Sequence, residues 1–190
     1  MSNSVLNKVQ PYLKSQADYF KQFIKSPRTF GSLAPSSPWL CNRMVQLADL
    51  SSATVIAELG AGSGVLTRRL LNRLAPDSEL DAYEIQPDLA KQLQVLAKQD
   101  DRLQIISQSA ERLQRNYDII FSCLPLLSIP AMPRLRILRQ IRERLNQGGT
   151  LIQFQYSPMS EKLLSRYFVW ERVYEMRNFP PAWVYLCTPR

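Results

Sequence analysis

A largely apolar run that ends in three alternating glycines constrains the fold of this chain more than any other feature. The run Val55–Leu59 is followed by Gly60, Gly62 and Gly64. An apolar run of this length is typical of a buried strand, and glycines allow a tight turn in which backbone N–H groups approach a ligand closely. The sequence therefore predicts a buried strand that turns sharply into a helix, with a ligand site at the turn.

The spacing of these glycines and the acid before them indicate which ligand the turn binds. In a dinucleotide fingerprint, G-x-G-x-x-G, the third glycine would fall at Val65. The chain instead has the pattern acid-x-G-x-G-x-G, with Glu58 two residues before Gly60. A carboxylate at this place repels a pyrophosphate and suits a ligand with a cationic ammonium group. The pattern therefore favours S-adenosylmethionine over NAD as the cofactor.

Strands and helices alternate along the chain from residue 54 onward. We expect strands near 54–59, 79–84, 103–107, 117–122 and 150–156. We expect helices near 63–74, 87–98 and 131–146, the last of them ending at Gly148-Gly149. The segment 166–188 is rich in aromatic residues and valine and predicts two antiparallel strands at the sheet edge. This order predicts an α/β fold, with a mostly parallel, doubly wound sheet of seven strands and helices on both faces.

The first 28 residues predict an amphipathic helix with a basic polar face. Apolar residues recur at helical spacing, at Val5, Val9, Leu13, Ala17, Phe20 and Ile24. Five basic residues against Asp18 give this segment half of the chain's formal net charge of +8. Such a helix fits the interface of an anionic membrane, although a helix packed on the domain core would need the same apolar stripe. We therefore expect residues 1–37 to be an N-terminal helix and link, and residues 38–190 to be the cofactor-binding domain, with Ser37 capping a helix that begins at Pro38.

The composition excludes several classes of chemistry. There is no histidine, which excludes Ser-His-Asp catalysis and histidine-ligated zinc. The three cysteines, Cys41, Cys123 and Cys187, have no metal-ligand spacing, so we expect no metal and read them as reduced thiols. No apolar run is long enough to span a bilayer, and no export signal is evident. We expect a cytoplasmic protein that associates peripherally with the inner face of the membrane.

Polar residues follow the ends of the expected strands. Glu84 closes the second strand, 20 residues after Gly64, where an acid accepts hydrogen bonds from ribose hydroxyls. Ser109 follows the third strand, beside the expected adenine ring, and Ser122 ends the fourth. The expected cofactor contacts are Glu58, Gly60, Ala61, Gly62, Gly64, Glu84, Ile85, Ser109, Ala110 and Ser122.

These segments resemble a known group of enzymes. Residues 54–156 resemble the class I S-adenosylmethionine-dependent methyltransferases, and nearly the whole chain resembles the bacterial phospholipid N-methyltransferases. The closer resemblance rests on Phe20-x-x-Phe23, Gly31-Ser-Leu-Ala-Pro-Ser-Ser37, Glu84-Ile-Gln-Pro87, Ser122-Cys-Leu-Pro-Leu-Leu127, Gly148-Gly-Thr-Leu-Ile-Gln-Phe-Gln-Tyr-Ser-Pro158 and Asn178-Phe-Pro-Pro-Ala-Trp-Val184. It implies a Rossmann-like fold and methyl transfer from S-adenosylmethionine to the amine of phosphatidylethanolamine, or of ornithine lipid in related enzymes. Its expected partners are that lipid and an anionic membrane surface.

Two positions of this resemblance concern the site. Where members of the superfamily often carry an Asp that holds the adenine amino group, this chain has Ser109. Tyr156, just past the fifth expected strand, matches the Gln-Phe-x-Tyr segment of the family. We expect Tyr156 to orient the head group, with Ser122 and Leu124 as further catalytic candidates, while a packed aromatic is the alternative role for Tyr156. Because the amine must lose a proton before it attacks, a Tyr, Asp, Glu or water must accept that proton.

Ribosomal RNA adenine methyltransferases are the second family that the chain resembles. They carry Asn-Leu-Pro-Tyr or a similar sequence after the fourth strand, where an amide or carbonyl accepts from the target amine and an aromatic ring stacks on the flipped base. Cys123, Leu124, Pro125 and Leu126 stand at these positions, or the match begins at Ser122 if the register shifts by one, and the aromatic ring is missing. RNA methylation, which the arginine-rich segment 131–146 would suit, is the second hypothesis. A cofactor-binding protein without catalysis is the third.

Overall fold

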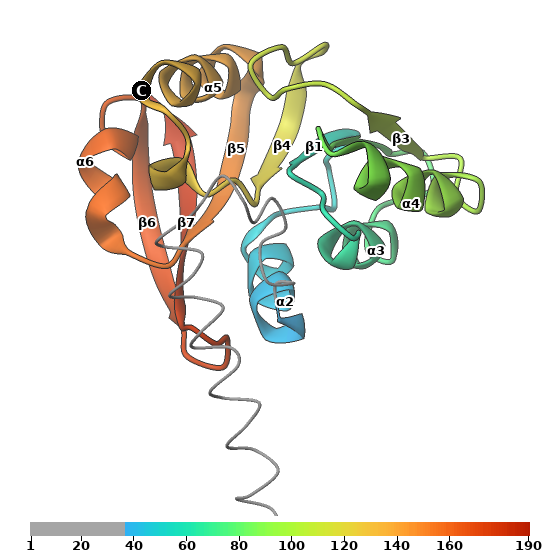
Figure 1. The fold of residues 1–190 in the computed structure, drawn as a ribbon, viewed down its shortest axis with the longest axis horizontal. Coiled ribbons are helices and arrows are strands. Elements are labelled where there is room, and N and C mark those ends of the chain that lie inside the picture. Colours follow the sequence, from blue (N-terminus) through green and yellow to red (C-terminus); the bar gives the residue numbers. More distant parts are fainter. Residues whose placement is uncertain (1–36) are drawn as a thin grey trace, which may run out of the picture. The chain divides into compact units, whose positions relative to one another are not determined.

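Seven strands form one sheet in the computed structural model, which describes residues 37–190 (Figure 1). The strands are β1 (Val55–Leu59), β2 (Glu79–Tyr83), β3 (Leu103–Ile106), β4 (Tyr117–Ser122), β5 (Leu145–Gln155), β6 (Phe168–Glu175) and β7 (Ala182–Pro189). Their order in the sheet is β3-β2-β1-β4-β5-β7-β6. The first five pair in parallel, and β7 is antiparallel to both β5 and β6. The predicted fold class and the predicted antiparallel tail are confirmed.

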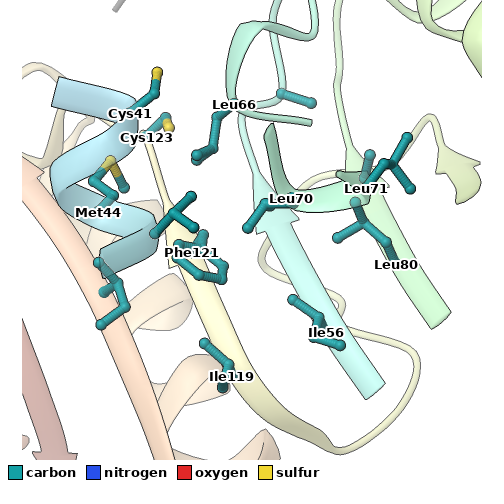
Figure 2. Close-up of a cluster of buried hydrophobic side chains, with 14 of the residues drawn as sticks. Cys41, Met44, Ile56, Leu66, Leu70, Leu71, Leu80, Ile119, Phe121 and Cys123 are labelled. Atoms are coloured by element: carbon teal, nitrogen blue, oxygen red, sulfur yellow. The ribbon is translucent and has the colours of Figure 1, made fainter. Parts of the chain in front are cut away.

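Helices cover both faces of this sheet. One face carries α2 (Pro38–Leu47), α3 (Val65–Leu71) and α4 (Pro87–Ala97), and the other carries α5 (Ala131–Arg144) and the short α6 (Glu161–Leu164). Two single-turn helices, η1 (Leu126–Ser128) and η2 (Pro158–Ser160), follow β4 and β5. Each face has its own apolar core. Figure 2 shows part of the first core, where Met44 of α2 and Leu70 of α3 lie around Phe121 of β4.

Strand alternation decides which face each side chain of β1 meets. Ile56 belongs to the core beneath α2 and α3, whereas Ala57 and Leu59 belong to the core beneath α5. Because successive side chains of a strand point to opposite faces, Glu58 lies on the same face as Ile56. The acid before the glycine turn is therefore buried under α2 and α3.

The predicted end of helix α5 at Gly148-Gly149 is wrong. The helix ends at Arg144, and β5 begins at the next residue and runs through both glycines. A Cβ atom on Gly149 would lie 3.0 Å from the carbonyl oxygen of Asp118 and 3.1 Å from that of Tyr117, so glycine lets β5 approach β4 closely. The pair of glycines marks an irregular strand pairing here, where the register of β4 and β5 shifts.

The described part of the chain begins at the cap of α2. The backbone N–H of Leu40 donates to Ser37 Oγ at 3.2 Å, and Pro38 stands in the first turn, as predicted. The amphipathic helix expected in residues 1–28 lies outside the described residues, so that helix and the division at residue 37 stay predictions. No helix within residues 37–190 is long and apolar enough to cross a membrane.

Candidate active site

The glycine turn after β1 is bound to the end of β2. The backbone N–H groups of Gly60 and Ala61 both donate to the carbonyl of Tyr83, at 2.9 and 3.1 Å. Gly60, Gly62 and Gly64 have φ values of +76°, +57° and +80°, in the left-handed region that favours glycine. A Cβ atom on Gly62 would meet no atom of residues 37–190 within 4 Å. Within this part of the chain, the turn therefore has open space at Gly62.

Glu84, at the end of β2, holds this turn in place. Its carboxylate accepts from the N–H of Gly62 and from the N–H of Gln86, both at 2.8 Å. The carboxylate is nearly buried, while the adjacent Ile85 is 69% exposed. The structure thus brings together Gly62 and Glu84, two of the predicted cofactor contacts, and leaves Ile85 accessible beside them.

Glu58 is a fully buried carboxyl group beneath the same turn. Within residues 37–190, neither of its oxygens has a hydrogen bond of normal geometry, and the nearby Thr67 hydroxyl also lacks one. The pKa of Glu58 is raised to about 8, mainly by burial; the hydroxyl and N–H of Thr67 oppose this shift, and the charge of Glu84 contributes to it. Buried polar groups are almost always paired in proteins, so this carboxyl suits a cationic ligand group.

The loop after β3 lies on the other side of Glu84. The N–H of Glu84 donates to the carbonyl of Ile106 at 3.1 Å, which joins the ends of β2 and β3. In the loop, Ser109 Oγ accepts from the N–H of Glu111 at 3.2 Å, and Ala110 is buried. The Glu111 carboxylate pairs with Arg136 of α5 at 3.3 Å. Ser109 and Ala110 are therefore near the end of β2, as their predicted role requires, and that role stays a prediction.

The loop after β4 packs directly on the glycine turn, and we refer to Ser122–Leu126 as the acceptor loop. The N–H of Cys123 donates to the carbonyl of Leu59 at 2.9 Å, which joins the ends of β4 and β1. A Cβ atom on Gly60 would lie 3.0 Å from Leu124 Cδ2. Glycine at this position therefore makes room for Leu124. The predicted cofactor contacts of the glycine turn and the predicted catalytic candidate Leu124 thus lie side by side.

The side chains of two glutamines of β5 donate hydrogen bonds to carbonyls of the acceptor loop. The carbonyl of Leu124 accepts from Gln155 Nε2 at 2.9 Å and from Gln153 Nε2 at 3.2 Å. Gln153, which is fully buried, also donates to the carbonyl of Ser122 at 3.2 Å. Sequence reasoning missed both residues. The available signal is a pair of amides two residues apart, on one face of an otherwise apolar strand.

Ser122 and Tyr156, two predicted site residues, have different surroundings. Ser122 is fully buried, and its hydroxyl accepts from the N–H of Leu124 at 3.5 Å, so it contacts the loop itself. Tyr156 is half-buried and packs edge-to-face on Phe154, with ring centroids 5.5 Å apart. Burial raises the pKa of Tyr156 to about 12, and a hydrogen bond with Asn178 opposes that shift. The phenol therefore keeps its proton at neutral pH.

Asn178 is a third residue that sequence reasoning left without a role. It is buried in the turn between β6 and β7, where its Oδ1 accepts from the N–H of Ser37 at 3.1 Å and its Nδ2 donates to the carbonyl of Pro180 at 2.6 Å. Through its contact with Tyr156 it links the start of α2, the β6–β7 turn and the end of β5. The position of Tyr156 thus depends on three separate segments.

Comparisons with known proteins agree with this geometry. Residues 57–151 match a family model described as a methyltransferase domain. The chain is 32% identical over 182 residues to an ornithine lipid N-methyltransferase of Singulisphaera acidiphila, which covers 89% of this chain and 93% of that protein. It is also 24% identical over 165 residues to a tRNA1(Val) (adenine(37)-N6)-methyltransferase of Yersinia enterocolitica, which covers 83% of this chain and 63% of that protein.

Solved structures share the fold at low identity. The N-methyltransferase NodS from Bradyrhizobium japonicum, in complex with S-adenosyl-L-homocysteine, has a TM-score of 0.66 at 16% identity and covers 80% of this chain and 88% of its own. A putative RNA methyltransferase from Pyrococcus horikoshii has a TM-score of 0.63 at 17% identity and covers 78% of this chain and 82% of its own. These likenesses show the Rossmann-like fold of class I methyltransferases.

Proposed function

Because this chain belongs to the class I S-adenosylmethionine-dependent methyltransferases, we propose that it methylates the amine of a membrane lipid head group. The amine would be of the phosphatidylethanolamine or ornithine lipid type. The family match and the 32% identical relative make the chain an N-methyltransferase that uses S-adenosylmethionine. The acceptor is the part that we infer.

The observation that best supports a lipid amine as the methyl acceptor is that the Leu124 carbonyl already accepts two hydrogen bonds. A carbonyl oxygen has two lone pairs, and this one accepts from the amides of both Gln153 and Gln155. In adenine methyltransferases, a carbonyl or amide after the fourth strand accepts from the amine of the base. The Leu124 carbonyl is already occupied within the protein, so it is not free for this task.

The neighbouring positions are equally unsuited to a base. Cys123 is buried and has a pKa well above its usual value because of that burial, so a neutral thiol stands where an amide would accept a hydrogen bond. Leu126 is fully buried in the core beneath α5 and presents no ring for stacking. Stacking of a base on an aromatic side chain is worth about 1–3 kcal/mol, which a buried leucine cannot supply. An aliphatic amine needs neither feature.

The residues around the glycine turn fit S-adenosylmethionine. Within residues 37–190, the Glu58 carboxyl has no hydrogen-bond partner and suits the ammonium of the methionine moiety, and the open space at Gly62 leaves room beside the backbone. Glu84, already aligned by two backbone N–H groups, has a carboxylate that suits the ribose hydroxyls. The bound cofactor supplies a methyl group on a sulfonium, which makes it the electrophile.

The task of the acceptor side is to hold a neutral amine in line with that methyl group. An apolar surrounding lowers the pKa of an amine, because burial disfavours its charged form. The acceptor loop offers Leu124 on the glycine turn, and Tyr156 stands nearby as a neutral phenol. We infer that Tyr156 orients the head group by a hydrogen bond and is not the base, since its phenolate is disfavoured at neutral pH. The proton then leaves through a carboxylate or water.

Methyl transfer to separated substrate classes tests this function. The purified chain would be incubated with methyl-labelled S-adenosylmethionine and vesicles that contain phosphatidylethanolamine or ornithine lipid, and in parallel with tRNA and ribosomal RNA. We expect label in the lipid fraction, and none from a Glu84→Ala variant used as the control for cofactor binding. Label in RNA alone would overturn the proposal in favour of the adenine reaction of the Yersinia relative.

A further inference from the structure

Exposed apolar side chains gather at one edge of the sheet. Of the ten large apolar residues that are exposed within residues 37–190, seven lie in segments at the carboxyl ends of the parallel strands. One of them, Ile85, stands beside the expected cofactor site. We call the other six the apolar rim: Trp39, Leu127, Met132, Met159, Met176 and Phe179. Isolated exposed apolar residues are normal on a protein surface, but a cluster on one side marks an interaction surface.

The topology explains why these segments share an edge. The loops that carry Leu127 and Met159 follow β4 and β5, and Met132 stands in the first turn of α5. Since β6 runs in the same direction as β5, the β6–β7 turn with Met176 and Phe179 projects from the same side. In Figure 1, the arrow of β4 points down the page, toward the side on which α2 and the β6–β7 turn lie.

The apolar rim has two halves with the acceptor loop between them. In one half, η1 with Leu127 contacts η2 with Met159. In the other half, the guanidinium of Arg177 lies 4.8 Å from the centre of the Trp39 ring, which places α2 beside the β6–β7 turn. The acceptor loop ends where η1 of the first half begins. Tyr156 precedes η2 in the chain and contacts Asn178 in the β6–β7 turn, so it links the two halves. Any surface that contacts both halves therefore covers the acceptor side of the site.

Each methionine of the apolar rim has a basic residue close by in the sequence. Arg134 follows Met132, Lys162 follows Met159, and Arg177 follows Met176 directly. Arg134 and Lys162 pair with no carboxylate among residues 37–190, and Arg134 donates only to the carbonyl of Leu126, whereas Arg177 pairs with Glu175 at 2.9 Å. Apolar side chains near two cations without a carboxylate partner match the interface of an anionic bilayer, where the apolar groups enter the acyl boundary and the cations meet the phosphates.

We propose that the apolar rim is the surface by which this protein docks on an anionic bilayer, with the acceptor loop facing the lipid head groups. The biological role of this docking rests on the proposed function: a head-group amine of the bilayer could reach the acceptor loop without leaving the membrane interface. The docking itself needs no methyl transfer. It is also independent of the helix expected in residues 1–28.

Vesicle binding tests the docking without any substrate. Full-length protein would be sedimented with vesicles of phosphatidylglycerol and phosphatidylcholine, which contain no primary amine. We expect the double variant Leu127→Glu/Met159→Glu to lower the partition coefficient at least about tenfold, since it adds two repelled charges and removes two apolar contacts. The matched control is Val95→Glu/Val169→Glu, which changes two exposed valines that lie outside the apolar rim, and it should bind like the unmodified protein.

A second measurement reports on the apolar rim even where residues 1–28 dominate binding. Trp39 belongs to the apolar rim, so phosphatidylcholine with brominated acyl chains, mixed into the same vesicles, should quench its fluorescence. A Trp39→Phe variant should lose that share of the quenching. Docking is overturned if the Leu127/Met159 variant binds as its control does and Trp39 is not quenched.

The outcomes also distinguish membrane docking from contact of the apolar rim with a second copy of this chain, and they test docking separately from the proposed function. A shift from dimer to monomer in the Leu127/Met159 variant, with unchanged vesicle binding, would assign the apolar rim to a second copy of this chain and overturn the proposal. If the docking is right, the same variant methylates a micellar lipid amine normally and fails on vesicles. Vesicle binding that depends on the apolar rim, with no lipid methylated, would reject the lipid substrate and leave the docking surface intact.

Discussion

The substitution Gly62→Ala separates the cofactor site from the stability of the fold. Gly62 has a φ of +57°, and a Cβ atom there would meet nothing within 4 Å among the described residues. Gly148, outside the site, has a φ of +77° and equally free surroundings, so Gly148→Ala is a matched control. An L-residue in the left-handed region costs roughly 1–2 kcal/mol, and this cost is the same for both variants. For a chain of this size we expect both melting temperatures to fall by roughly 2–8 °C.

The two variants should differ in cofactor affinity. The new methyl group of Gly62→Ala projects into the space that we assign to S-adenosylmethionine, so we expect its dissociation constant to rise at least about tenfold, or about 1.4 kcal/mol. Gly148→Ala should bind as tightly as the unmodified protein. Titration calorimetry with S-adenosyl-L-homocysteine and thermal unfolding give both quantities. Equal affinities in the two variants, at equal losses of stability, would refute the placement of the cofactor at Gly62.

Three further predictions concern the buried polar groups of the site. Glu84→Ala should weaken cofactor binding at least about tenfold in calorimetry, because charge-assisted hydrogen bonds contribute about 1.5–3 kcal/mol, while Asp88→Ala on the surface of α4 should not. Since burial raises the pKa of Glu58 from 4.5 to about 8, the folded protein should lose stability as pH rises through this window, and binding of the cofactor at pH 6.5 should release a proton. Calorimetry in buffers of different ionisation enthalpy measures that proton, and Glu58→Gln should abolish both effects. Gln155→Leu should lower kcat by roughly 3–10-fold with little change in cofactor affinity, because it removes one of the two hydrogen bonds on the Leu124 carbonyl and loosens only the acceptor loop; an unchanged kcat would count against this role.

Four of the parallel strands could be predicted from the sequence. The expected strands 54–59, 79–84, 103–107 and 117–122 lie close to the observed bounds of β1, β2, β3 and β4, because strands covered by helices on both faces are rich in apolar residues. The error at Gly148-Gly149 has a physical cause. Two glycines after a helical pattern usually mark a helix end, but here they permit the close approach of β5 to β4, which only the sheet pairing reveals.

The sequence by itself determined the cofactor half of the site. Glu58, the three glycines and Glu84 lie within 27 residues of one strand–turn–helix–strand unit, so their spacing alone fixes how they meet. From the sequence, Glu84 is expected to accept from ribose hydroxyls, and the structure shows that its carboxylate also accepts from the N–H of Gly62.

Only the tertiary structure decided the surroundings of the acceptor. Gln155 binds the carbonyl of Leu124 across 31 positions of the chain, and Asn178 binds Ser37 across 141. Such contacts depend on the order and register of the strands, because a shift of one residue along β5 would turn both of its glutamines to the opposite face. The apolar rim likewise comes from segments that only the sheet topology places at one edge. A local sequence motif therefore indicates the methyl donor, whereas the evidence on the methyl acceptor comes from segments that only folding brings together.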